Sequence, residues 1–96
     1  MINVQDLFSG LEVTDNAKEA QIETVNYLTN LGFYCVMEHR VKDRGNGRPG
    51  YVDIFAEKGD IRLAIEFDHR SPRTKSIYKL KQLNNCQKII LLRGHG

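Results

Sequence analysis

The sequence is poor in cysteine and contains no long apolar run. Its two cysteines, Cys35 and Cys86, stand far apart, with neither a C-x-x-C pair nor a Cys/His cluster. This spacing disfavours a zinc site and is typical of buried, reduced cysteines in a cytoplasmic protein. No run reaches the length of a membrane-spanning helix, and no basic-then-apolar signal opens the chain, so we expect a cytoplasmic protein with no membrane partner.

Acidic side chains are absent from the end of the chain. Residues 69–96 carry seven lysines and arginines and no acid, although the net charge of the whole chain is only +2. Clustered lysine and arginine favour a phosphate-rich partner, above all nucleic acid. The alternative is a basic tail that serves only solubility.

The chain is too short for two hydrophobic cores. Its 96 residues, 41% hydrophobic and 27% charged, suit one ordinary globular domain. We assign this domain to residues 16–96. Residues 1–15 give weak signals, and we interpret them as a segment that docks on the domain or contacts a second copy of the chain.

Hydrophobic spacing and turn residues predict an α-β-β-β-α-β order. The expected elements cover residues 16–31, 33–41, 51–58, 61–68, 71–85 and 88–93. The glycine-rich, basic stretch at 42–50 reads as a loop. The fold class expected from this order is α/β (α+β), a single small domain with a central mixed four-stranded sheet flanked by helices.

Apolar spacing also predicts which helix faces are buried. The first helix should end at Gly32, and Ser71-Pro72 should open the second. The apolar face of the hairpin at 51–68 should pack on the first helix. The helix residues expected to be buried are Ile22, Val25, Leu28 and Leu31 in the first helix and Ile77, Leu80 and Leu83 in the second.

Turn chemistry places two carboxylates opposite each other in the hairpin. A two-residue turn at Gly59-Asp60 pairs Glu57 with Arg62 and, further along, Asp53 with Glu66. Like charges in facing positions cost stability, and Asp68 adds a third acid on the same face. A hard divalent cation with oxygen ligands would offset this repulsion. The alternative is that these acids are simply solvated on an exposed face.

The same residues carry a family resemblance. An Asp within one strand, twelve intervening residues, and then Glu66-Phe67-Asp68 at the end of the next strand stand within the α-β-β-β-α-β order. This arrangement resembles the PD-(D/E)XK nuclease superfamily across residues 16–93. The resemblance implies a restriction-endonuclease-like fold. It also implies Mg²⁺ or Mn²⁺ held by Asp53 and Glu66, with the backbone carbonyl of Phe67 as a further ligand.

The sequence departs from the family pattern at Asp68, where a catalytic lysine is usual. Asp68 would then hold a second metal or act as a base on water, or Lys75 in the following helix would replace the missing lysine. Loss of activity is the third reading. The resemblance also implies an acid from the first helix, for which Glu19 and Glu23 are the candidates. Glu19 alternatively stabilises the helix start, three residues after Asn16.

The leading hypothesis is a Mg²⁺-dependent DNA endonuclease, or a nicking or junction-type enzyme. Duplex or branched DNA would require a homodimer, because a domain of this size holds one site. The alternatives are an inactive nucleic-acid-binding module that keeps the fold, and an interaction protein whose charges are only solvated. The residues expected to grip the phosphate backbone are Lys42, Arg44, Arg48, Arg70, Arg73, Lys75 and Lys79.

Overall fold

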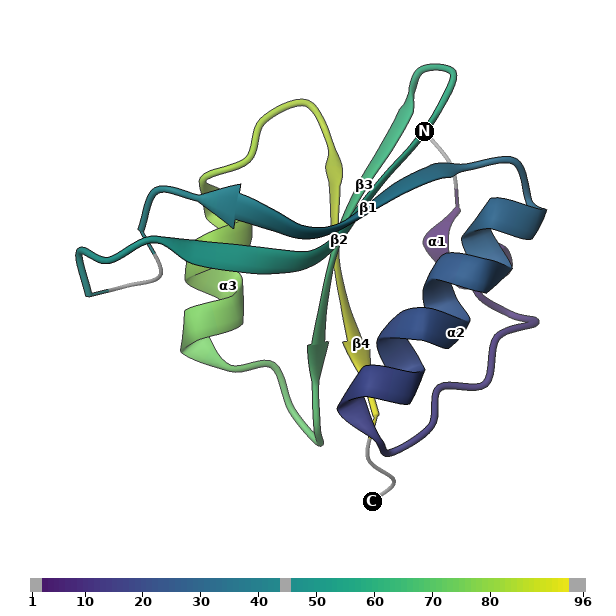
Figure 1. The fold of residues 1–96 in the computed structure, drawn as a ribbon, viewed down its shortest axis with the longest axis horizontal. Coiled ribbons are helices and arrows are strands. Elements are labelled where there is room, and N and C mark those ends of the chain that lie inside the picture. Colours follow the sequence, from purple (N-terminus) through teal and green to yellow (C-terminus); the bar gives the residue numbers. More distant parts are fainter. Residues whose placement is uncertain (1–2, 44–45, 94–96) are drawn as a thin grey trace.

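The computed structural model describes residues 3–43 and 46–93, in which one mixed sheet lies between helices (Figure 1). Its strands lie side by side in the order β1-β2-β3-β4, with antiparallel β1–β2 and β2–β3 pairs and a parallel β3–β4 pair. This confirms the predicted α+β class and mixed sheet. A short extra helix, α1, precedes the predicted elements. The bounds are α1 Val4–Leu7, α2 Ala17–Asn30, β1 Tyr34–Val41, β2 Gly50–Lys58, β3 Ile61–Asp68, α3 Thr74–Lys81 and β4 Gln87–Leu92.

The two long helices cover opposite faces of the sheet. Alternation along β3 sends Leu63 and Ile65 into a core cluster with Leu28 of α2. Ala64, between them, belongs to a second cluster with Leu80 of α3. Each face of the sheet therefore has its own helix and its own core. The hairpin's predicted apolar face packs on α2 except at Val52, which joins the α3 cluster.

The hairpin register agrees with the prediction. Lys58 pairs with Ile61, Glu57 with Arg62, and the pairing continues to Ile54 with Ile65. Gly59 has φ 57°, the left-handed conformation that a primed two-residue turn needs at its first position. The turn thus determines which residues of β2 and β3 face each other.

Helix α2 has the predicted ends but a different buried face. The side chain of Asn16 accepts the Glu19 N–H at 3.0 Å, as an N-cap does. The residues buried in α2 are Ala20, Gln21, Thr24 and Leu28, whereas Ile22 and Leu31 are 44% and 39% exposed. The predicted stripe was therefore wrong at two of its four positions.

Helix α3 is shorter than predicted and buries polar residues. It begins at Thr74 instead of Pro72, and its N-cap Arg73 makes no capping bond with its own side chain. Its buried residues are Ser76, Lys79 and Leu80, while Ile77 is 40% exposed. Within the predicted stripe, Leu80 is buried and Leu83 packs against the same cluster. The stripe did not predict Ser76 and Lys79, because these polar side chains are buried where they pair with carboxylates of the sheet.

Residues before α2 dock on their own domain. Val4, Leu7 and Phe8 pack against the α2 core cluster, and the Tyr27 hydroxyl donates to the Leu7 carbonyl at 2.6 Å. The rings of Phe8 and Tyr27 stack with centroids 6.3 Å apart. The described part of residues 1–15 therefore packs on the domain of its own chain.

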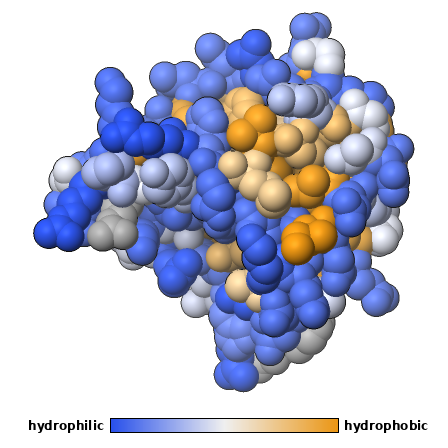
Figure 2. All heavy atoms as spheres, in the orientation of Figure 1, coloured by the Kyte–Doolittle hydropathy of each residue, from blue (hydrophilic) through white to orange (hydrophobic). Residues whose placement is uncertain are grey.

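Most of the face seen in Figure 2 is hydrophilic, with an apolar patch where α2 and β1 adjoin. Exposed apolar side chains of these two elements include Ile22, Val36 and Met37.

Across the part of the chain that the structure describes, no helix has the length and apolarity needed to cross a membrane.

Candidate functional site

Three acids occupy one rung of the sheet. Glu38 and Asp53 lie between the β1–β2 pairs Met37–Ile54 and His39–Val52, so they face each other. Asp53 in turn meets Glu66 just beyond the last recorded β2–β3 pair. We call Glu38, Asp53 and Glu66 the acidic rung. The predicted meeting of Asp53 with Glu66 is present, and a third acid from β1 extends it.

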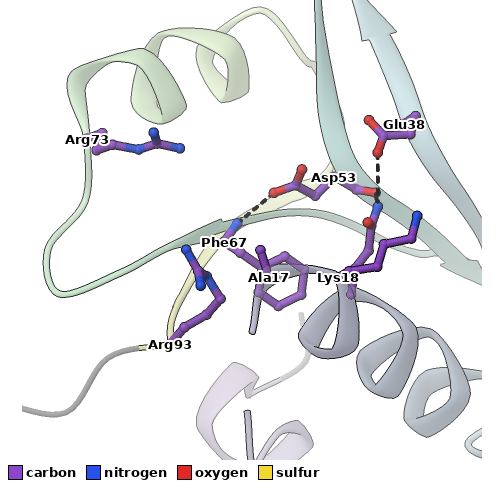
Figure 3. A pocket seen from close by; sticks show the side chains of 8 residues that line it. Ala17, Lys18, Glu38, Asp53, Phe67, Arg73 and Arg93 are labelled. Carbon is purple, nitrogen blue, oxygen red and sulfur yellow. Dashed lines mark hydrogen bonds between the residues drawn. The ribbon is translucent and has the colours of Figure 1, made fainter. Parts of the chain in front are cut away.

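Side chains link β2 and β3 at this rung. Glu66 Oε2 accepts the backbone N–H of Asp53 at 2.8 Å. Figure 3 shows the second bond, in which Asp53 Oδ2 accepts the backbone N–H of Phe67 at 2.9 Å. Each carboxylate is therefore held by the strand opposite its own. No donor among the described residues contacts the second oxygen of Asp53, Oδ1.

Glu66 is buried beside a lysine from α3. The residue is 1% exposed, and its Oε1 forms an ion pair with Lys79 Nζ. Lys79 Nζ also donates to the Tyr51 carbonyl at 2.9 Å. Burial, together with the nearby Asp53 carboxylate, raises the pKa of Glu66 to about 7, although Lys79 and the Asp53 N–H oppose this change. The lysine brought to the acidic rung is therefore Lys79, and Lys75, predicted for this place, is exposed.

Asp53 faces a cavity of about 340 Å³ on the α2 side of the site. Two carboxylates and three cations lie among its lining residues. Gln21 of α2 joins two members of the rung, because its Nε2 donates to the Asp53 carbonyl at 2.9 Å and to Glu38 Oε1 at 3.4 Å. The lining residues are Ala17, Lys18, Gln21, Glu38, Asp53, Phe67, Arg73 and Arg93 (Figure 3).

Glu38 has an unusual backbone conformation. Its φ of 61° is left-handed in the middle of a strand, where a residue with a Cβ pays about 1–2 kcal/mol. Sequence patterns did not reveal Glu38, because glutamate carries no turn signal and the 42–50 loop leaves the β1–β2 register open. Its strain and its place beside Asp53 make it a candidate site residue.

Asp68 does not belong to the rung. It is 1% exposed and does not line the cavity. Its Oδ2 accepts the Arg73 backbone N–H, and its Oδ1 accepts Arg73 Nε and the Ser76 hydroxyl, all at 2.8 Å. Burial alone would raise the pKa of Asp68, but these donors outweigh it and hold that pKa below its usual value. The structure therefore gives Asp68 a different position from the metal ligand or base expected from the sequence.

The first-helix acids also lie away from the cavity. Glu19 and Glu23 each stand two positions from Gln21, which is about 200° around an α-helix. Neither lines the cavity, and the helix residue that reaches the rung is Gln21. The acid that lies beside Asp53 is therefore Glu38 of β1, while the two glutamates expected from α2 do not line the cavity.

The predicted phosphate-binding residues lie in different surroundings. Arg73 lines the cavity, and Lys79 is buried on Glu66, so Lys79 does not present its charge to a nucleic acid. Lys42 lines a separate cavity of about 410 Å³ beside Arg40 and Gln82. Arg44 lies outside the described residues. The remaining predicted residues, Arg48, Arg70 and Lys75, are exposed.

Two cations at the cavity were missed by sequence reasoning. Lys18 lies one turn before Gln21 in α2, and Arg93 directly follows β4. Parallel strands end at the same edge of a sheet, so the position of Arg93 beside the end of β3 was a usable signal. The Arg93 backbone N–H donates to the Asp68 carbonyl at 2.8 Å.

The acidic rung is not a preformed metal site. Within residues 3–43 and 46–93, no three His, Cys, Asp or Glu side chains form a ready metal cluster. Mg²⁺, however, commonly takes one or two carboxylates and fills its other positions with water and phosphate oxygens. Asp53 Oδ1, which no described donor contacts, lies at an open cavity and suits this mode. To bind the same ion, Glu66 would have to use an oxygen that already accepts a hydrogen bond.

No protein family, curated protein or solved structure matches this chain.

Proposed function

We propose that this protein hydrolyses DNA phosphodiester bonds with the help of Mg²⁺ or Mn²⁺, as an endonuclease or as a nicking or junction-type enzyme. The observation that carries the proposal is the acidic rung beside a cavity. Asp53 of the rung lines this cavity together with the cations Lys18, Arg73 and Arg93. A carboxylate beside several cations is the charge pattern that phosphodiester hydrolysis needs.

Asp53 and Glu66 would hold the metal ion, with the Phe67 carbonyl as a further ligand suggested by the PD-(D/E)XK resemblance. The ion would lower the pKa of a bound water and neutralise charge on the phosphate. The chain itself keeps the two carboxylates in place through the backbone N–H groups of Asp53 and Phe67. Hydrogen bonds of this kind limit the rearrangement needed when substrate binds.

In this proposal Lys79 takes the place of the missing motif lysine. Its Nζ lies on Glu66 and is screened from water, since the side chain is only 10% exposed. Its ammonium group would hold the Glu66 carboxylate in place beside the metal ion. The three cations of the cavity would orient the phosphate. The part of the chain that the structure describes forms one such site, so cutting both strands of a duplex calls for a homodimer.

A cleavage assay tests the proposal. Purified protein is incubated with supercoiled plasmid and with a branched DNA, in Mg²⁺, in Mn²⁺ and in EDTA. Asp53→Asn removes the charge at the rung, and Asp60→Asn is a matched control in the exposed hairpin turn. We expect metal-dependent nicking by the wild type and by Asp60→Asn, with a loss of at least a hundredfold in Asp53→Asn. Cleavage by Asp53→Asn at the wild-type rate, or none by the wild type on either DNA, would reject the nuclease.

A catalytically inactive nucleic-acid-binding module is the second candidate. The observation that favours it is that both oxygens of Glu66 already have partners within the protein and that the residue is 1% exposed. This candidate predicts salt-sensitive DNA binding without cleavage, and no rise in melting temperature when Mn²⁺ is added. The nuclease predicts a Mn²⁺-dependent rise that Asp53→Asn abolishes.

A further inference from the structure

Asp68 holds Arg73 at two points. One carboxylate oxygen accepts the backbone N–H of Arg73, and the other accepts its side-chain Nε, both at 2.8 Å. The Ser76 hydroxyl donates to the second oxygen, also at 2.8 Å, which restrains the carboxylate itself. The Asp68 side chain is 0% exposed, so water does not compete for these bonds.

The outer part of Arg73 remains available. Its side chain is 62% exposed, and among the described residues no acceptor contacts its terminal Nη1 and Nη2 groups. In Figure 3 the guanidinium extends from the start of α3 toward the cavity that Asp53 lines. A guanidinium held through Nε keeps its terminal N–H groups, and one N–H from each Nη can donate to two oxygens of the same phosphate.

We propose that Asp68 is a positioning residue that fixes the Arg73 guanidinium as a clamp for one backbone phosphate of DNA in the Asp53 cavity. This inference rests on the proposed function for the identity of the ligand. It assigns a role to the acid that stands where the PD-(D/E)XK pattern has lysine. Lysine could not serve at position 73, because its ammonium group lacks both the Nε contact and the paired terminal donors.

Binding measured without metal tests the clamp separately from cleavage. The probe is a fluorescent duplex oligonucleotide, titrated in EDTA at several salt concentrations and followed by anisotropy. Arg73→Gln should weaken binding about tenfold and lower the slope of log K against log salt by about 0.9, the loss of one phosphate contact. Arg73→Lys should weaken binding severalfold despite its charge. Arg62→Gln, an arginine near the hairpin turn that does not line the cavity, should bind as the wild type does.

A double-mutant cycle identifies the positioning role. Asp68→Asn should weaken binding severalfold in the wild-type background and add nothing in the Arg73→Gln background, because it acts only through Arg73. Equal weakening in both backgrounds, no weakening in either, or no DNA binding by the wild type would overturn the clamp. Circular dichroism melts check folding, and Ser76→Ala replaces Asp68→Asn in the cycle if the latter does not fold. A clamp confirmed in EDTA with no cleavage in Mg²⁺ would reject only the nuclease.

Discussion

Lys79 of α3 and Glu66 of β3 form an ion pair in which the two side chains are 10% and 1% exposed. A buried pair is costly to break from one side, because the remaining charge keeps its desolvation penalty without its partner. The pair therefore links the stability of the domain to the chemistry of the acidic rung.

Removing Lys79 should destabilise the domain strongly. At pH 8, where Glu66 is mostly charged, we expect Lys79→Met to lower the free energy of unfolding by about 3–5 kcal/mol, measured by urea denaturation in EDTA. Lys75→Met, on the exposed face of the same helix, should change it by less than about 0.5 kcal/mol. Adding Glu66→Gln to Lys79→Met should restore part of the loss. A double variant less stable than Lys79→Met would contradict an interaction between the two residues.

The raised pKa of Glu66 predicts a stability that falls as pH rises. Its pKa changes from an ordinary 4.5 to about 7 in the folded state, so the native protein binds this proton more tightly than the unfolded chain does. The contribution of Glu66 to the free energy of unfolding is complete below pH 4.5. It should decline by up to about 1.4 kcal/mol per pH unit until about pH 7.

Urea titrations between pH 4 and 8 in EDTA would measure this decline. Glu66→Gln cannot titrate and should remove it, whereas Glu57→Gln, in the exposed pair with Arg62, should leave it in place. Parallel pH profiles for the wild type and Glu66→Gln would show that Glu66 is not the group responsible.

Glycine should be tolerated better than alanine at position 38. Both variants remove the carboxylate, but only glycine adopts a φ near the observed 61° without cost. We expect Glu38→Gly to be about 1 kcal/mol more stable than Glu38→Ala in thermal or urea unfolding. At the adjacent Met37, which has no positive φ, the order should reverse by about 0.5–1 kcal/mol. The same order at both positions would argue against strain at Glu38.

Alanine at Gly32 should destabilise the end of α2. The N–H groups of Gly32 and Phe33 donate to the carbonyls of Thr29 and Leu28, which is a Schellman ending with Gly32 at φ 94°. A Cβ there would lie 3.3 Å from Lys58 Cε, and we expect a loss of about 1–2 kcal/mol in melting experiments.

Gly10→Ala is the control for this variant. Its Cβ would also lie 3.3 Å from a neighbouring side-chain atom, the Tyr27 hydroxyl oxygen, but Gly10 has no positive φ. It should therefore cost less than Gly32→Ala. Similar losses at the two positions would attribute the effect to contacts and not to backbone conformation.

Local signals predicted the fold better than they predicted the site. The Gly59-Asp60 turn determines the hairpin register, so the meeting of Asp53 with Glu66 followed from counting residues. The long connection between β1 and β2 carries no such information, and Glu38 was missed for that reason. The register between the two hairpin strands was therefore predictable, whereas the register between β1 and β2 was not.

Helix faces were predicted poorly where polar groups are buried. An apolar stripe assumes that burial follows hydrophobicity, yet Ser76 and Lys79 are buried because they pair with Asp68 and Glu66. The same pairing explains why Lys79, and not the more exposed Lys75, reaches the acidic rung. Such choices depend on the tertiary position of a carboxylate, which spacing within one helix does not reveal.

The bond from the Phe67 N–H to Asp53 Oδ2 makes one amide proton a reporter of the site. That proton is sheltered only while the Asp53 carboxylate stays across the gap between β2 and β3. Its rate of hydrogen–deuterium exchange would therefore report how often this hydrogen bond breaks in the free protein, without bound ion or nucleic acid. A slow rate would mean that the two strands and the two carboxylates separate only when the sheet itself unfolds.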